Sequence, residues 1–306
     1  MDRFFDALFL GLSSGAIYAL VALGLVVVFR GTGDLNFAQG EMATLSAFIT
    51  AIVAGSTIPL LHWVIPLWFA TLVGMAFGFA LGVSTEVIIV RPLKRRSPLA
   101  VFVALIALFL GINALTTGLW GAPPPETIGS LFPNAPTDFV RLFGTVWRYR
   151  DIGNLVLTLI ASGLLFLLFQ KTRFGLAMRA VASNPESGRL VGIPTGVVLA
   201  ASWGIAGALG ALAGTLFAAG QGQVTPILMF YVFVVASAAA TLGGLDSPLG
   251  AVVAGLLIGI IENMAATFAP GWVGQEMKLA VALVCIFVVL LVRPSGLFGS
   301  TKVERV

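Results

Sequence analysis

The sequence has few charged residues. Only 10% of its 306 residues are Asp, Glu, Lys or Arg, whereas 58% are hydrophobic. A soluble domain typically has about 25% charged residues, so a soluble fold of this length could not bury so much apolar surface. The apolar residues form continuous runs, such as 101–110 and 279–292, and not the short alternating segments of a membrane β-barrel. The sequence therefore predicts an all-α fold, a polytopic bundle of transmembrane helices.

The residues that carry most enzyme chemistry are also scarce. One cysteine, Cys285, and one histidine, His62, provide neither a metal-ligand set nor an intrachain disulfide. No lysine follows a glycine, so the phosphate-binding pattern G-x-x-x-x-G-K-[ST] is missing, as is H-E-x-x-H. We therefore expect no metal, no cofactor and no enzymatic activity in this chain by itself.

Nine apolar segments are long enough to predict membrane spans within a single transmembrane domain, residues 1–306. In the second segment Asn36, Gln39 and Glu41 crowd the start, so this helix is either intact, broken or re-entrant, and eight or ten spans remain alternative counts. The predicted segments are 5–29, 35–54, 61–83, 99–120, 152–170, 196–219, 227–244, 249–268 and 277–292.

The basic residues predict the orientation of these spans. With nine alternating spans, one side of the membrane receives Arg30 and the basic clusters in 91–96, 171–189 and 293–305. By the positive-inside rule this side is cytoplasmic, which places the C-terminus inside and the N-terminus outside. The loop 121–151 is then external and the loop 171–195 cytoplasmic. The net charge of +4 is thus a topology signal, and we expect no binding to nucleic acid.

The loop 171–195 contains the sequence pattern of a short capped helix. Asn184 suits the N-cap, Pro185 the first helical position, and Glu186 the positive end of the helix dipole. Gly192 suits the position just after the helix, with Pro194 beyond it. Such a helix is too polar to span the membrane. It either docks a cytosolic partner or connects two spans.

Carboxylates inside apolar segments are costly, so each one is a functional candidate. Glu262 lies deep in the eighth segment, where it either borders a polar translocation path or makes a structural hydrogen bond. Glu86 precedes Arg91 by five residues, and these two can pair. Small residues spaced by four mark close helix contacts, within the chain or between subunits: Gly11/Gly15, Gly74/Gly78/Gly82, Gly210/Gly214 and Gly255/Gly259.

Several stretches, in this order and spacing, resemble the branched-chain amino acid permeases of ABC transporters, of the LivH type. The likeness covers nearly the whole chain, although the charged stretch Arg30 to Asp34 departs from it. The matching stretches are 17–25, 35–42, 86–93, 113–121, 173–175, 184–193, 242–251 and 293–299.

The resemblance implies one permease subunit of a bacterial inner-membrane importer. Its partners would be a second related permease, two cytosolic ATPases and a periplasmic substrate-binding protein, in a lipid bilayer. The loop at 184–192 matches the region expected to contact an ATPase, which nominates Arg179, Asn184, Pro185, Glu186 and Arg189. The substrates left open are branched-chain or other amino acids, amides and urea.

Transport sites favour interrupted helices near the path, so we expect the path to involve Asn36, Gln39 and Glu41, with Ser247 and Glu262 behind them. Residues 33–40 resemble residues 243–250, and this similarity is either an internal repeat or chance. Two other classes remain: a gradient-driven secondary transporter or channel, which needs no ATPase, and a membrane enzyme, which would act alone.

Overall fold

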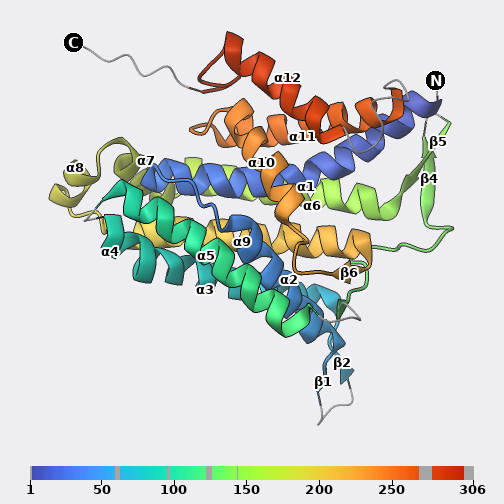
Figure 1. The fold of residues 1–306 in the computed structure, drawn as a ribbon, viewed down its shortest axis with the longest axis horizontal. Coiled ribbons are helices and arrows are strands. Elements are labelled where there is room, and N and C mark those ends of the chain that lie inside the picture. Colours follow the sequence, from blue (N-terminus) through green and yellow to red (C-terminus); the bar gives the residue numbers. More distant parts are fainter. Residues whose placement is uncertain are drawn as a thin grey trace. The chain divides into compact units, whose positions relative to one another are not determined.

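The computed structural model describes residues 2–58, 63–94, 97–121, 126–142, 144–268 and 278–299. Each predicted apolar segment coincides with a helix there (Figure 1). These helices are α1 (Asp2–Thr32), α2 (Gln39–Gly55), α3 (Leu67–Ser84), α5 (Pro98–Trp120), α6 (Tyr149–Lys171), α9 (Thr195–Gln221), α10 (Phe230–Gly243), α11 (Pro248–Phe268) and α12 (Lys278–Val292).

Six helices of the described residues are long and apolar enough to cross a membrane. They are α1, α3 with its continuation to Lys94, α5, α6, α9 and α11. Helices α2, α10 and α12 have 17, 14 and 15 described residues. The prediction of a multi-pass helical membrane protein is therefore confirmed, whereas the count of nine spans is not.

The chain forms two compact units that interleave in sequence. Unit 1 comprises residues 1–26, 132–162 and 233–306, and unit 2 comprises 27–131 and 163–232. Helices α1, α6 and α10 each continue from one unit into the other. Each unit is described by itself below.

Unit 2 is built on α2, α3 and α9, which pack against one another. Their closest approach is at glycines: a Cβ added to Gly207 of α9 would lie 2.0 Å from the carbonyl oxygen of Gly78 of α3. Likewise, a Cβ on Gly82 would lie 2.2 Å from the carbonyl oxygen of Trp203. The small-residue motifs 74–82 and 210–214 thus serve packing within the chain.

The helix that begins with α3 changes its winding before it ends. A π-helical turn, η1 (Thr85–Val90), follows α3 directly, and a short helix, α4 (Arg91–Lys94), follows η1. Such turns are rare and frequently occur at functional sites. A broken or re-entrant helix is one of the alternatives predicted for the second apolar segment, but α2 is continuous from Gln39 to Gly55.

Helix starts in both units follow from the local sequence. Ser97 accepts a hydrogen bond from Leu99 N–H at the start of α5, and Ser247 accepts one from Gly250 N–H at the start of α11. In each case a proline follows the capping residue, at the position where a helix needs no N–H donor.

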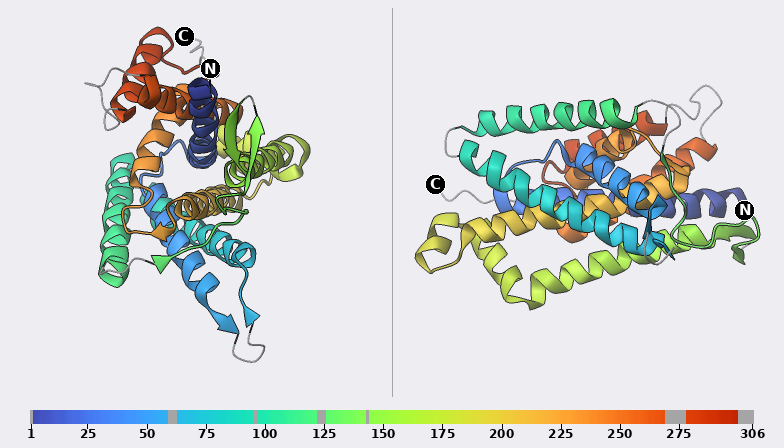
Figure 2. Two further views of the ribbon diagram at one scale, coloured as in Figure 1. Left: turned by 90° about the vertical axis from the view of Figure 1, so that its right-hand side faces the viewer. Right: turned by 90° about the horizontal axis from the view of Figure 1, so that it is seen from below.

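The two ends of unit 2 differ in structure. One end carries α4 and the helices α7 (Arg173–Ser183) and α8 (Pro185–Leu190) (Figures 1 and 2). The other end carries two antiparallel strand pairs: β1 (Thr57–Ile58) with β2 (Trp63–Val64), and β3 (Glu126–Thr127) with β6 (Gln223–Val224).

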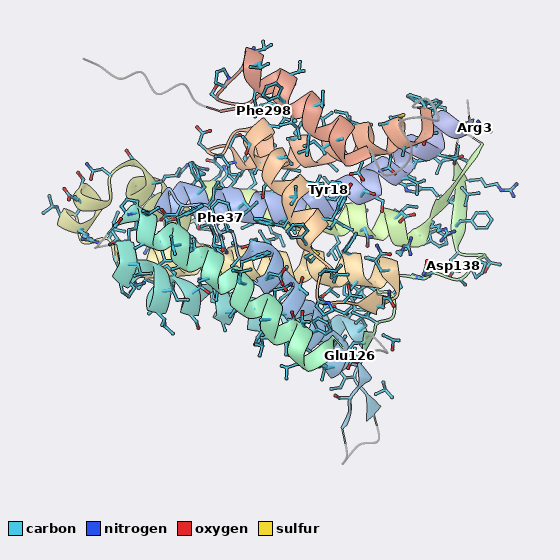
Figure 3. All side chains as sticks on the ribbon, in the orientation of Figure 1. Arg3, Tyr18, Phe37, Glu126, Asp138 and Phe298 are labelled. Carbon is cyan, nitrogen blue, oxygen red and sulfur yellow. The ribbon has the colours of Figure 1, made fainter. Side chains whose placement is uncertain are left out.

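Unit 1 is built around the close antiparallel contact of α1 with α11. A Cβ on Gly11 would lie 2.6 Å from Ile260 Cα, and a Cβ on Gly15 would lie 2.8 Å from Leu256 Cα. The hairpin of β4 (Phe139–Leu142) and β5 (Thr145–Arg148) contacts the N-terminal part of α1, where Trp147 stacks on Phe9. Accordingly, Figure 3 shows Arg3 and Asp138 at the same end of this unit.

The predicted loop 121–151 is thus partly structured, by β3 and the β4–β5 hairpin. Its prolines at 123–125, as well as His62 and residues 300–306 of the basic tail, lie outside the described residues.

Candidate functional site

The connection between α1 and α2 holds a buried cluster of side-chain amides. Asn36 Nδ2 donates to Gln39 Oε1 (2.9 Å), and Asn36 Oδ1 accepts from Ala38 N–H (3.1 Å). Gln39 Nε2 donates to the carbonyl oxygen of Ala206 in α9 (2.7 Å). Asn36 is 1% exposed and Gln39 is 0% exposed. They fix the start of α2 against α9 and leave few polar atoms free for a ligand.

Glu41, in the first turn of α2, differs from its neighbours. Its side chain is 1% exposed and is hydrogen-bonded by the side chain of Asn113 in α5. Its Oε2 atom has no hydrogen-bond partner among the described residues. A buried polar atom without a partner costs free energy. Glu41 is therefore the residue of this cluster that can accept a further hydrogen bond, through Oε2.

A cavity of about 310 Å³ lies beside the same connection. Leu35 and Phe37, which flank Asn36, line it together with Val101 and Leu105 of α5, and Asp34 is its charged lining residue. Its size is near the lower limit for small-molecule pockets.

The charged stretch Arg30 to Asp34, where the chain departs from the resemblance, forms an ordered end to α1. Lys94 Nζ pairs with Asp34 Oδ2 (2.7 Å) and also donates to the carbonyl oxygen of Thr32. The positive charge of α4 thus neutralises Asp34, which explains how the loop accommodates a carboxylate.

Ser247 and Glu262 belong to unit 1, whereas Asn36, Gln39 and Glu41 belong to unit 2. Ser247 caps α11. Glu262 Oε2 accepts a hydrogen bond from Tyr18 Oη (2.8 Å), with both side chains buried; Figure 3 shows Tyr18 midway along α1. The structure thus brings the first three residues together and gives each of the other two a bonding role in its own unit.

The capped helix predicted at 184–192 is present as α8. Asn184 Oδ1 accepts from the N–H groups of Glu186 and Ser187 (both 3.0 Å), and Pro185 is the first helical residue. At the other end Gly192 has φ +81°. The N–H groups of Gly192 and Ile193 return to the carbonyls of Arg189 and Gly188, which is a Schellman motif.

The tip of this loop exposes apolar side chains. Leu190 and Val191 are 89% and 75% exposed, at the end of a helix that carries Glu186 and Arg189. Arg179, on α7, donates to Gln170 Oε1 (3.0 Å), so it holds α7 against the end of α6. An exposed apolar tip with charges beside it is typical of a protein contact.

The predicted pairing of Glu86 with Arg91 is confirmed. Arg91 Nη2 and Nε lie 2.5 and 3.1 Å from the two carboxylate oxygens of Glu86. A buried hydrogen bond from Ser13 Oγ to Asp151 Oδ1 (2.9 Å) in unit 1 is not predictable from the sequence. It joins residues 138 positions apart, and no local pattern signals it.

The described residues thus define a multi-pass helical membrane protein with buried polar groups and an exposed loop helix. A family model described as branched-chain amino acid transport system / permease component matches residues 7–290. The chain therefore belongs to this family of ABC transporter permeases, and it is a transport component and not an enzyme.

Its relatives match over most of their length. The chain is 27% identical to the high-affinity branched-chain amino acid permease LivH of Escherichia coli, over 99% of this chain and 98% of that protein. It is 30% identical to BraD of Pseudomonas aeruginosa, over 97% and 96%. It is also 27% identical to the galactose/methyl galactoside import permease MglC of Escherichia coli, over 84% and 77%.

Proposed function

We propose that this chain is one of two related permease subunits of an ATP-driven importer in a bacterial inner membrane, and that its substrates are branched-chain or similar amino acids. Two cytosolic ATPases would drive it, and a periplasmic binding protein would deliver the substrate. The family membership and the names of LivH and BraD support the substrate class. Because the chain is also similar to a galactose permease, leucine uptake is the measurement that tests the substrate class.

The observation that carries the proposal is the tip of α8. Leu190 and Val191 are 89% and 75% exposed, next to charged side chains in a loop that is too polar to span the membrane. Burial of two such side chains by a partner contributes roughly 1.5–3 kcal/mol each. Glu186 and Arg189 on the same helix add charges for pairing, and Asn184 and Pro185 fix its start.

Topology and path complete the proposal. We place nine spans in the membrane, with the C-terminus and α8 in the cytoplasm and the loop 121–151 outside. Arg91, Lys94, Arg179 and Arg189 all lie on elements at one end of unit 2, as a cytoplasmic end requires (Figure 1). A fluorescent protein fused after residue 306 should fold and fluoresce, whereas a C-terminal alkaline phosphatase should be inactive; the reverse result contradicts this orientation.

In the proposed cycle, ATP binding displaces α8 and re-aims the membrane helices, so that the path opens to each side in turn. The path would run beside the start of α2, with Glu41 as its polar residue and Asn36 and Gln39 as the support of that helix. Within unit 1, Ser247 and Glu262 are the proposed path residues. The cavity of about 310 Å³ beside Asn36 agrees with this placement.

The test is co-purification in mild detergent, followed by leucine uptake in proteoliposomes. The wild-type chain should co-purify with two ATPases and a second permease, and uptake should require ATP. Leu190→Ser with Val191→Ser should release the ATPases. Ile227→Ser is the matched control, since Ile227 is 72% exposed near β6, at the other end of unit 2. ATP-independent uptake by the chain alone would instead indicate a gradient-driven transporter or channel.

A further inference from the structure

The π-helical turn η1 and the ion pair across it require each other. In an α-helix, residues five apart point about 140° away from one another, because a turn takes 3.6 residues. In a π-helix the hydrogen bonds join residues five apart, so these residues lie on one face. Arg91 N–H donates to the carbonyl oxygen of Glu86, and the two side chains pair through two hydrogen bonds above that same turn. The pair therefore holds the turn in its π form.

The guanidinium of Arg91 has a second contact, outside its own helix. Its Nη2 donates to the carbonyl oxygen of Gly196 (2.7 Å), in the first turn of α9. A Cβ on Gly196 would lie 3.2 Å from Nη1 and 3.3 Å from Cζ, so the guanidinium lies directly against this glycine. Glu86 is 1% exposed, and Arg91 is thus fixed between a buried carboxylate and the start of α9.

The residue before Gly196 connects the same point to α8. Thr195 Oγ1 accepts a hydrogen bond from Arg189 Nε of α8 (3.1 Å). Thr195 itself is 5% exposed. The first two residues of α9 therefore each accept a hydrogen bond from an arginine: Thr195 from Arg189 of α8, and Gly196 from Arg91, which directly follows η1. A continuous set of charge-assisted contacts joins the exposed loop helix to the π turn.

We propose that Glu86 and Arg91 are positioning residues for transport: they transmit the displacement of α8, through the start of α9, to the π turn. This proposal rests on the proposed function, since it takes α8 as the contact with the ATPase. The π turn is the two-state element that such a coupling requires. When the Arg91 contacts rearrange, η1 can rewind to α-helix. Because α3 and α9 touch backbone to backbone at Gly78 and Gly207, a shift at the start of α9 also moves α3.

The first test removes the ion pair. Arg91→Gln, in the complete complex with its ATPases, should leave assembly intact but lower the amount of leucine transported per ATP hydrolysed by roughly fivefold or more, a change in the range expected for residues of a coupling network. Arg91→Lys keeps the charge but loses the bidentate geometry, so it should restore the ratio only in part. Lys94→Gln is the matched control, because Lys94 lies in the same short helix but pairs with Asp34 and not with α9.

The second test removes the π turn and keeps the pair. Deletion of Ile88, which is 70% exposed, leaves Glu86 and the arginine four residues apart, a spacing at which they pair in an ordinary α-helix. We expect the complex to assemble and hydrolyse ATP but to lose leucine uptake. A purely structural role for the pair predicts the opposite result, that this variant retains transport.

The outcomes separate the two proposals. A wild-type complex that binds no ATPase, or moves no leucine, contradicts the proposed function. If the α8 variants release the ATPases but Arg91→Gln leaves the ratio of leucine to ATP unchanged, the proposed function stands and the coupling role is wrong. Loss of assembly and of both activities in proportion would also assign the pair a structural role only.

Discussion

Replacing Gly207 with alanine should separate the two helices at the centre of unit 2. The new Cβ would lie 2.0 Å from the carbonyl oxygen of Gly78 and 2.8 Å from its carbonyl carbon, whereas ordinary contact begins at 3.4 Å. Both obstructing atoms belong to the backbone, so no side-chain rotation can relieve the clash. The helices must therefore move apart, and inserting a methyl group into such a contact typically costs about 1–3 kcal/mol.

Gly111→Ala is the matched control, with the opposite expected sign. Gly111 lies inside α5, and nothing lies within 4 Å of the Cβ that would be added. Alanine there removes the helix cost of glycine, about 0.5–1 kcal/mol, without a clash. Because both variants add one methyl group to a helix, their difference isolates the effect of the contact between α3 and α9.

The measurement is thermal unfolding of the purified permease in one detergent, followed by tryptophan fluorescence. Gly207→Ala should lower the midpoint by a few degrees, on the order expected for this loss of stability, and Gly111→Ala should leave it unchanged or raise it. The reasoning is refuted if the two variants unfold at the same temperature.

Three further changes test other parts of the structure. Asn184→Ala should weaken α8 by about 0.5–2 kcal/mol and reduce ATPase retention in the pull-down, whereas Asn184→Asp, which can still cap the helix, should not; equal loss in both would argue against the cap. Tyr18→Phe removes the donor to Glu262 and should destabilise the chain by about 1–3 kcal/mol, seen as a lower midpoint of thermal unfolding, while an unchanged midpoint would assign that bond no structural weight. Glu41→Gln should preserve thermal stability, because Oε2 has no partner to lose, but lower leucine uptake; full uptake would remove Glu41 from the path.

Much of the loop helix could be predicted from the sequence because its determinants are local. Asn184, Pro185 and Gly192 act within a few residues of α8, through a side-chain cap, a missing N–H and a left-handed backbone. The spacing of Glu86 and Arg91 likewise indicated a pair. The same spacing carries a further signal, because five residues is also the span of the backbone hydrogen bond in a π turn.

The path residues could not be assigned in the same way, because their roles depend on distant partners. Asn36, Gln39 and Glu41 look alike in the sequence as polar residues at the start of an apolar segment. In the structure the two amides bond to each other and to Ala206 of α9, whereas one oxygen of Glu41 is left without a partner among the described residues. The distinction depends on a helix about 170 residues further along the chain, since Gln39 and Ala206 are 167 positions apart.

Composition and local pattern determined the class of this protein, its helices, the family it resembles and the capped loop helix, because hydrophobicity, helix caps and spacing act over a turn or two of chain. Tertiary structure alone decided which glycines lie in contact and which buried polar groups form hydrogen bonds with one another. It also decided that Arg91 and Arg189 both bind the start of α9. These contacts join segments far apart in the sequence, and their energies depend on distances of a few ångströms that only the packed helices establish.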